Sequence, residues 1–482
     1  MKRKIISVML LSAMLITAAA GCKKTEETVD NKPVLKVYMP NMAGTITDLD
    51  EVIAKANELV ADKIGAKMEF IYIDVGAYTE KMNMKLASNE EFDICFTSGW
   101  LNPYEKAVKN GSYYPMKKLI DENCPELWDT MEDYWWEAAT YDDDIYGVPN
   151  QQIVSTIPAM TMNKKWAEKY NLDVDSIKTI DDIEPFLKQI HDNEPDVYPV
   201  RPAGLGYKTK YESIISCIRL DGSNENEYKA VFEWDDPNYM RSIEKMRDWF
   251  KKGYIRQDIA SVIDDNNDFK GNKYVITATG WKPGFEASQA AQLGGEHIAI
   301  LLDDHVTVNK GSCLATMWAI SANTKYPAES IKLINEFETN KELYNLLCYG
   351  IEGKHYEWID SEHVRQNKDS GYFMNQAWAF GNQFNAYIRE GEDTNVWVET
   401  KKINAEAVPA RLMEFEFDNS NVQMEISQCE TVQSEFKNIF NGSADYTTQF
   451  PEYKERMMKA GAQNILNEVQ RQLDQFAKTQ KK

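Results

Sequence analysis

The order of short apolar strands and amphipathic helices predicts an α/β protein built from two αβ regions. Strands and helices alternate from residue 34 to residue 97, and a second alternation begins near residue 156. No low-complexity linker separates the two regions. This pattern indicates two lobes joined by several short crossings, each lobe a mainly parallel sheet flanked by helices. A cleft between such lobes is a common place for a ligand.

The first region has the spacing of a β-α-β-α-β unit, which predicts parallel strands with right-handed crossovers. Ligands of such sheets bind beyond the carboxyl ends of the strands. The loops 39–45, 74–78 and 98–104 should therefore face a site. The expected strands are 34–39, 67–73 and 92–97, and the expected helices are 48–64, where Gly65 suits the C-cap, and 78–87.

The second region repeats the alternation up to residue 340, and a long amphipathic helix with a joint at Gly461 ends the chain. The expected strands are 156–162, 274–278, 297–301 and 314–320, and the expected helices are 164–170, 180–191, 239–252, 327–340 and 452–479.

The N-terminus has the pattern of a signal peptide. Three basic residues precede an apolar stretch over 5–20, and Ala19-Ala20-Gly21-Cys22 follows. The cysteine resembles that of a bacterial lipobox, so we expect cleavage after residue 21 and lipidation of Cys22 by acyl chains such as palmitate. Ordinary secretion is the alternative. The polar segment 22–32 then reads as a tether that holds a folded part on the extracytoplasmic face of the cell membrane.

Charge and missing motifs narrow the function classes. The chain of 482 residues carries 76 acids against 54 Lys and Arg, a net charge of −22, which disfavours nucleic acid and anionic lipid as partners. It has no HExxH, GxSxG or GxxxxGK[ST] motif, and its five histidines lack metal-ligand spacing. We therefore expect no cofactor, no metal and no catalytic residue, although a carboxylate pair for glycoside hydrolysis stays open among so many acids.

The six cysteines beyond Cys22 are scattered and form no CxxC pair. A large exported domain with its own core does not need disulfides, so buried free thiols are the expectation.

Tryptophans at the ends of predicted strands point to a sugar ligand. Trp100 follows a strand-ending Ser-Gly, Trp281 follows Thr-Gly, and Trp378 precedes the amides of Asn382 and Gln383. An indole face can stack on the apolar C–H face of a pyranose, and amides suit its hydroxyls. Core packing is the alternative for each tryptophan, and it is the preferred reading for Trp378 and for the adjacent Trp135 and Trp136.

Several passages resemble the extracellular solute-binding proteins of ABC importers, in the family 1 branch that includes maltose-binding protein. They also resemble a subgroup of large lipoprotein receptors with a distinctive C-terminal domain. The passages are FDICFTSGW (92–100), DIYGVPN (144–150), NKYVITATGWKPG (272–284), 316–337, YGIEGKHY (349–356), FGNQ (380–383) and 460–473.

The resemblance implies a type II periplasmic-binding-protein-like fold with three crossings between its lobes, near Asn150, Cys313 and His355. The N-lobe would comprise 33–150 and 314–355, and the C-lobe would comprise 151–313 and 356–482. It also implies the ligand-binding set, in which Trp281 takes the place of a stacking tryptophan. That set is Trp100, Asn150, Gln151, Trp281, Trp378, Asn382 and Gln383.

The sequence therefore predicts a monomeric, lipid-anchored receptor that captures a carbohydrate, an oligosaccharide in our reading, and delivers it to an ABC permease. A receptor for another solute such as a peptide, or a sensor accessory protein, is the second hypothesis. A surface glycan-cleaving enzyme is the third. The sequence names neither the sugar nor the permease.

Overall fold

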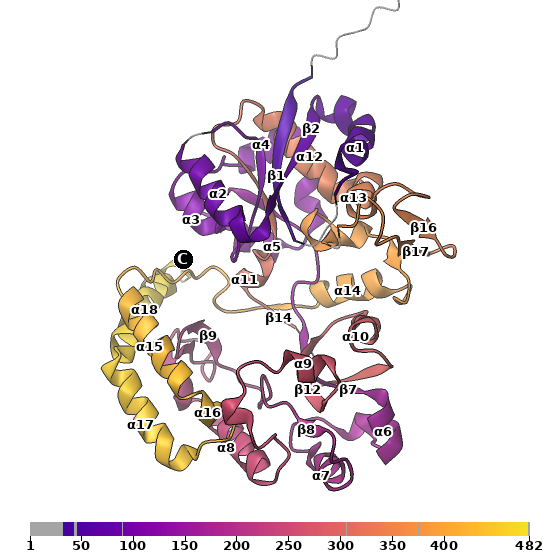
Figure 1. Ribbon diagram of the computed structural model, residues 1–482. Helices are drawn as coiled ribbons and strands as arrows, with labels where there is room; N and C mark the ends of the chain where they lie inside the picture. The colour runs from indigo at the N-terminus through magenta and orange to yellow at the C-terminus, as the bar shows by residue number, and fades with distance from the viewer. Residues whose placement is uncertain (1–31, 43–45, 89, 305, 375, 481–482) are drawn as a thin grey trace, which may run out of the picture.

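The computed structural model describes residues 32–42, 46–88, 90–304, 306–374 and 376–480, and it shows two lobes, one above the other (Figure 1). The helices near the C-terminus lie along one side of the lower lobe. The predicted signal peptide, Cys22 and all but the last residue of the predicted tether lie outside the described residues. Within the described residues, no helix combines the length and the apolar character that a membrane crossing needs.

The first lobe contains a five-stranded sheet in the order β2-β1-β3-β15-β6. β1 runs parallel to β2 and to β3, as predicted, whereas β15 is antiparallel to β3 and β6. The sheet is thus parallel only in the half formed by the N-terminal β-α-β-α-β unit. Its strands are β1 (Val34–Asn41), β2 (Lys67–Asp74), β3 (Ile94–Thr97), β6 (Gly147–Pro149) and β15 (Met317–Ile320).

Helices cover this sheet because each has an apolar face at helical spacing. In α1 (Leu49–Ile64) the buried residues include Val52, Ala56 and Val60, and the helix ends at Gly65, whose φ of 80° needs no Cβ. The predicted helix 48–64 is confirmed. The other helices are α2 (Val75–Ala87), α3 (Tyr104–Lys109), α4 (Lys117–Asn123), α5 (Asp133–Ala139), α12 (Pro327–Thr339) and α13 (Lys341–Tyr349), and the hairpin of β4 (Thr140–Tyr141) and β5 (Asp144–Ile145) follows α5.

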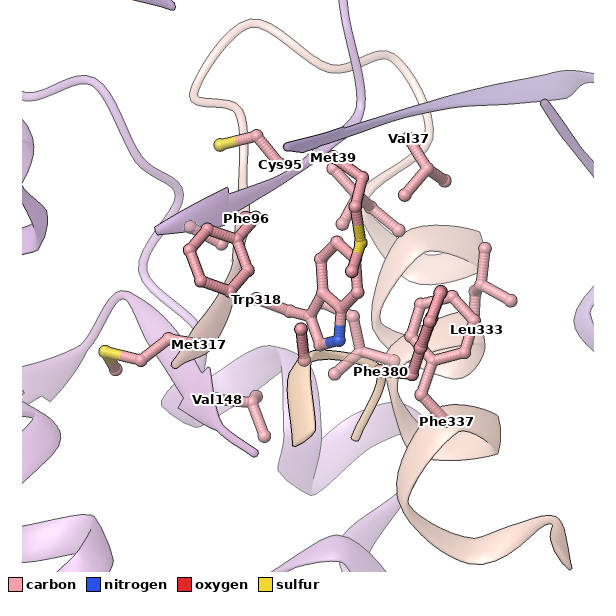
Figure 2. Close-up of a cluster of buried hydrophobic side chains, with 14 of the residues drawn as sticks. Val37, Met39, Cys95, Phe96, Val148, Met317, Trp318, Leu333, Phe337 and Phe380 are labelled. Carbon is pink, nitrogen blue, oxygen red and sulfur yellow. The ribbon is translucent and has the colours of Figure 1, made fainter. Parts of the chain in front are cut away.

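The core of the first lobe centres on Trp318 of β15, which is fully buried. Figure 2 shows its indole among the side chains of Phe96, Phe337 and Phe380. Its ring centroid lies 5.3 Å from that of Phe337 and 6.4 Å from that of Phe96. These rings come from a strand, a helix and a late segment of the chain, so the core joins regions far apart in sequence.

The second lobe contains a four-stranded sheet in the order β13-β7-β12-β8. β7 pairs antiparallel with both β12 and β13, and only β12 and β8 are parallel. The expectation of a mainly parallel sheet is therefore corrected for this lobe. The strands are β7 (Ile157–Asn163), β8 (Tyr198–Val200), β12 (Tyr274–Trp281) and β13 (His297–Leu301), and the helices are α6 (Lys164–Tyr170), α7 (Glu184–Asn193), α8 (Pro237–Lys251), α9 (Asn266–Lys270) and α10 (Phe285–Leu293).

A third unit packs beside this sheet and has its own core, formed with the C-terminal helices. Gly461, with φ of 101°, separates the last two helices, which confirms the predicted joint. A side chain there would collide with Glu425. The unit comprises an antiparallel sheet of β9 (Glu212–Ile215), β10 (Ile218–Leu220) and β11 (Ala230–Phe232) with α15 (Gln423–Glu435), α16 (Lys437–Phe440), α17 (Tyr446–Lys459) and α18 (Ala462–Thr479).

Two of the three expected crossings lie where the sequence placed them. The chain leaves the first sheet after β6 and enters the second at β7, and it returns between β13 and β15. The return segment contains β14 (Thr307–Val308) and α11 (Lys310–Cys313). Cys313 and Leu314 are buried in the core of the first lobe.

The third crossing lies later than expected. His355 is fully buried in the first lobe, with Nε2 3.2 Å from Asp48 Oδ2. The chain then stays on this lobe through β16 (Tyr356–Trp358), β17 (His363–Gln366) and β18 (Ile388–Arg389), and Val364 and Phe380 lie in its core. Residues 356–386 therefore pack with the first lobe, which corrects the expected C-lobe of 356–482.

The chain reaches the second lobe only after α14 (Val396–Ala405), which lies between the lobes in Figure 1. There β19 (Val408–Pro409) pairs in parallel with β14. Leu412 and Phe415 then pack against the core of the C-terminal helices. The third crossing is therefore near residue 408, about fifty residues beyond the predicted position.

Two sequence-based interpretations about burial are confirmed. Trp135 and Trp136 are 1% and 8% exposed and belong to the core of the first lobe. The six cysteines of the described residues are all buried and unpaired. Burial raises the pKa of their thiols, so they stay in the neutral thiol form at neutral pH.

Candidate functional site

An exposed tryptophan stands at the carboxyl end of β3, where the sequence predicted a ligand loop. The buried Ser98 accepts hydrogen bonds at its Oγ from the N–H groups of Trp100 (3.2 Å) and Leu101 (2.7 Å), which fixes the turn after the strand. Trp100 Nε1 donates to the carbonyl oxygen of Ala315 at 2.8 Å. The side chain is held at its polar edge, yet it is 55% exposed. A fixed indole with an open face is suited to stacking.

Trp378 lies beside Trp100 although 278 positions separate them in the chain. The two ring centroids are 6.5 Å apart and the planes are tilted by 48°. Trp378 belongs to the 3₁₀ helix η5 (Ala377–Ala379), and its carbonyl oxygen accepts from Thr316 Oγ1 at 3.4 Å. The two rings form an angled aromatic corner at the second crossing, next to the boundary between the lobes.

Trp281 approaches the first lobe from the second. It ends β12, opposite Ile157 of β7. Its Nε1 donates to Glu286 Oε1 at 3.0 Å, and its ring packs against the core of the first lobe. Trp281 is only partly buried. Its position on one lobe and its contact with the other make it sensitive to the angle between the lobes.

The amides of Asn150 and Gln151 have a different environment from the one expected of ligand-binding groups. They are 0% and 2% exposed. Asn150 Nδ2 donates to the carbonyl oxygen of Ala379 at 2.9 Å, and Gln151 Nε2 donates to Glu338 Oε2 at 3.1 Å. These bonds fasten the first crossing to α12 and to the segment that carries Trp378. In this structure the two amides support the site and do not face solvent.

Asn382 and Gln383 also take part in hydrogen bonds with backbone groups. Asn382 Oδ1 accepts from the N–H of Phe384 at 3.0 Å and so caps the short 3₁₀ helix η6 (Gln383–Asn385). The N–H of Gln383 donates to the carbonyl oxygen of Gln151 at 2.8 Å. Both side chains are only partly buried. The structure thus brings 150–151 and 382–383 together, as the resemblance implied, around a shared backbone contact.

Two residues of this framework carry no signal in the sequence. Asn404 of α14 is fully buried and forms two hydrogen bonds with the first crossing. Its side chain donates to the carbonyl oxygen of Gln152 (2.7 Å) and accepts from the N–H of Val154 (3.0 Å). Burial raises the pKa of Glu338 to about 8, so its carboxyl is mainly protonated at pH 7. Only the folded chain shows that these two side chains face the crossing.

A hollow of about 660 Å³ opens between the lobes beside the aromatic corner. Gly99, Pro103 and Lys106 line it on the first lobe, and Ile214 and Phe417 line it on the second. This volume is within the range of about 300–1,000 Å³ typical of ligand pockets.

Four of the six charged side chains that line this hollow pair with each other, and the other two, Lys106 and Asp418, are of opposite sign. Lys310 Nζ lies 2.8 Å from Glu105 Oε1 and 4.0 Å from Glu416 Oε2, and Lys109 forms an ion pair with Glu416. Lys109 is in α3 of the first lobe, whereas Glu416 is in the segment that packs on the second. The network therefore bridges the lobes and leaves the hollow without a strong charge of one sign.

A second cavity, of about 560 Å³, lies within the second lobe between the loop after β8 and the helices α8 and α16. None of the predicted site residues lines this cavity, and none lines the hollow between the lobes. Its charged groups are bonded within the protein: Arg201 forms two hydrogen bonds with Asp265, and Thr209 donates to Asp236. The hollow between the lobes is the better candidate site because residues of both lobes line it, and because its lining includes Gly99 and Leu314, which precede Trp100 and its hydrogen-bond partner Ala315 in the chain.

Comparison with known proteins agrees with this architecture. Residues 411–478 match a family model described as "Domain of unknown function (DUF3502)". The chain is 28% identical, over 98% of both chains, to a carbohydrate ABC transporter substrate-binding protein of Streptococcus pneumoniae serotype 4.

Among solved structures, the chain is similar to the N-glycan transport solute binding protein NgtS of Streptococcus pneumoniae. The TM-score is 0.80, with 26% identity over 93% of this chain and 100% of that one. The structure of NgtS in complex with Man1GlcNAc gives a TM-score of 0.67, with 25% identity over 93% of this chain and 100% of that one. The complex with Man5GlcNAc gives a TM-score of 0.63, with 26% identity over 93% of this chain and 99% of that one. The resemblance to extracellular solute-binding proteins of ABC importers is confirmed, and so is the two-lobed fold class.

Proposed function

We propose that this protein captures an oligosaccharide outside the cytoplasm and delivers it to the permease of an ABC importer. The observation that carries the proposal is the aromatic corner of Trp100 and Trp378 at the boundary between the lobes. The relative named as a carbohydrate ABC transporter substrate-binding protein and the glycan complexes of NgtS support the same assignment. These relatives are transport proteins, and the chain acts as a binding protein rather than an enzyme.

The chemistry of the corner suits a pyranose. The faces of Trp100 and Trp378 are tilted by 48°, so two faces of one sugar, or two neighbouring sugars, can each meet an indole. The paired charges around the hollow favour a neutral ligand, because an ionised group would have to compete with existing ion pairs. Trp281 supplies a contact from the second lobe when the lobes approach each other.

Closure follows from differential binding. A ligand that touches both lobes only in a closed state favours that state by its extra affinity for it. In this structure Trp100 is 55% exposed, so its ring is accessible to an incoming sugar.

The membrane attachment forms the finer part of the proposal. Residues 1–21 act as a lipoprotein signal peptide, Cys22 carries the acyl chains, and the mature monomer is held on the extracytoplasmic face of the cell membrane. The support is the basic, apolar and small-residue order that ends at Cys22. Cys22→Ser should release the protein from the membrane fraction into the medium, whereas persistence in the membrane would contradict the anchor.

The first experiment is a thermal-shift and tryptophan-fluorescence screen of the chain from Lys23 onward. The panel holds mono- and oligosaccharides, including Man1GlcNAc and Man5GlcNAc, and short peptides. A ligand at about a hundred times its dissociation constant adds about 2.7 kcal/mol to the free energy of unfolding.

A stabilising sugar that is recovered intact after hours supports the receptor and argues against glycan cleavage. Stabilisation by a peptide, with no response to any sugar, would overturn the carbohydrate assignment.

A further inference from the structure

The segment 411–418 stands where the chain enters its C-terminal domain, and no sequence motif or relative assigns it a role. We infer that this segment forms the second wall of the ligand site and that Phe415 and Phe417 contact the distal sugars of a neutral oligosaccharide. The inference rests on the proposed function and deepens it, because it assigns part of a domain of unknown function to ligand selection.

The segment lies between the lobes. The side chain of Met413 is buried in the core of the first lobe, whereas its neighbours Leu412 and Phe415 pack against the core of the C-terminal helices. Glu416 bonds to Lys109 on the first lobe. Side chains of one short segment therefore touch both bodies, which places it at the boundary where a ligand would be enclosed.

Two hollows meet at this segment. The first, of about 660 Å³, is the one beside the aromatic corner, and the second, of about 390 Å³, extends toward β9 and β14. Phe415 and Phe417 line both, together with Ile214, Lys310 and Gly311. The phenylalanines are only partly buried. They are partly exposed aromatic rings that the linings of both hollows share.

The first hollow begins at the neighbours of Trp100. The N–H of Gly99 donates to the carbonyl oxygen of Leu314 at 2.9 Å, and both residues line the hollow. Trp100 itself donates to Ala315, the next residue. The hollow thus begins at the residue next to Trp100, and Phe417 lines its wall on the second lobe. A ligand that contacts both must be longer than the part held by the aromatic corner.

The segment is held rigidly before any ligand arrives. The guanidinium of Arg411 donates to the carbonyl oxygens of Asp221 (3.2 Å) and Glu227 (2.6 Å). The ring of Phe415 meets Phe476 of α18 edge-on at 5.4 Å, and the N–H of Asp418 donates to Gln472 at 2.9 Å. Such pre-organisation lowers the entropy cost of binding.

The electrostatics of the junction select against a charged glycan. Glu416 and Glu105 pair with lysines, and Glu212 Oε1 accepts from the N–H of Arg411 at 3.3 Å. The other two charged side chains of the first hollow, Lys106 and Asp418, are of opposite sign. Lys310 is paired with Glu105 and is largely buried at its side chain. Because these charges cancel locally, hydroxyl groups and C–H faces suit the space better than carboxylates or sulfates.

The test compares short and long glycans on one variant. Phe417→Ala in the chain from Lys23 onward is titrated by calorimetry against two neutral ladders, Man1GlcNAc to Man5GlcNAc and maltose to maltohexaose. Tyr446→Ala removes a partly buried ring of the same domain outside the hollows and serves as the matched control. Phe417→Trp is the second variant, since its emission reports contact directly without deleting the ring.

We expect Phe417→Ala to weaken the longest bound glycan at least tenfold and the shortest less than twofold, with Tyr446→Ala unchanged for both. Phe417→Trp should gain an emission change with the long glycan only. Equal losses for short and long glycans, or no loss, would overturn the inference while leaving the proposed function in place. A wild-type chain that binds neither ladder overturns the inference together with the oligosaccharide assignment.

Discussion

The first lobe has one continuous hydrophobic core, whereas the second lobe has two, one under its four-stranded sheet and one among the C-terminal helices. In the first lobe, exposed residues at strand ends stand on a single rigid body. In the second lobe, the surfaces that face the site belong to separate units joined by loops. Strand-end patterns therefore identify exposed candidate residues more readily on a lobe with one core than on a lobe assembled from distant segments.

Two tryptophans of the first lobe differ in exposure because their local structures differ. Trp135 and Trp100 both belong to the first lobe, but their exposed fractions are 1% and 55%. Trp135 lies in a helix with an apolar neighbour on each side, whereas Trp100 follows a buried strand and a Ser-Gly turn. The local turn, rather than the residue type, separates a buried ring from an exposed one.

The largest expected effect tests whether the first lobe depends on a single core. Trp318→Ala removes the ring at the centre of Figure 2 and should lower the free energy of unfolding by about 3–5 kcal/mol. Urea denaturation measures it. Trp358→Ala, at a hairpin tip and 38% exposed, is the control and should cost about 1 kcal/mol or less. Similar losses for both variants would contradict the central position of Trp318.

The next largest effect concerns the buried carboxyl of Glu338, which accepts a hydrogen bond from Gln151 at the first crossing. Burial raises the pKa of Glu338 from 4.5 to about 8, so the folded chain binds this proton more tightly than the unfolded chain does. The contribution of Glu338 to the free energy of unfolding is therefore fully present below about pH 4.5 and is lost as the pH rises toward 8. Glu338→Gln, which cannot ionise, should be more stable than wild type at pH 8 by roughly 1–3 kcal/mol.

Thermal unfolding of both chains between pH 5 and pH 9 checks this prediction. The difference in Tm between Glu338→Gln and wild type should grow with pH. A constant difference across the range would show that Glu338 is ionised in the folded chain.

A smaller effect tests the aromatic corner and the contact from the second lobe. Trp100→Ala and Trp281→Ala should each weaken binding of the best sugar at least tenfold, about 1.4 kcal/mol, with the fold intact. Trp358→Ala is again the control, because its ring lies on the hairpin of β16 and β17. Calorimetric titration gives the affinities. Unchanged affinity in Trp281→Ala would confine the stacking surface to the first lobe.

The smallest effect tests the ion pair that joins the lobes. The side chains of Lys109 and Glu416 are 42% and 24% exposed, so solvent screens much of their attraction. A double-mutant cycle with Lys109→Ala and Glu416→Ala should give a coupling energy of roughly 0.2–1 kcal/mol that decreases as salt is added. A coupling that is indifferent to salt would argue for packing rather than charge as the link between α3 and the segment 411–418.

Much of the architecture could be predicted because it is local. The helix 48–64, the strand 297–301 and the joint at Gly461 follow from apolar spacing, β-branched runs and a glycine, all of which act within a few residues. Trp100 was predicted from the same kind of signal. The phenylalanines at 415 and 417 carry no such signal, because their exposure depends on where the C-terminal domain packs.

The sequence by itself determined the succession of strands and helices and the two-lobed class, because these depend on short-range periodicity and turns. Only the tertiary structure decided the strand directions in the second sheet, the position of the third crossing and the burial of Asn150 and Gln151. Each of these depends on pairing between segments about a hundred residues apart or more, as in β14 with β19 or Gln151 with Glu338. Such pairings are selected by the packing of the whole chain, which no local pattern encodes.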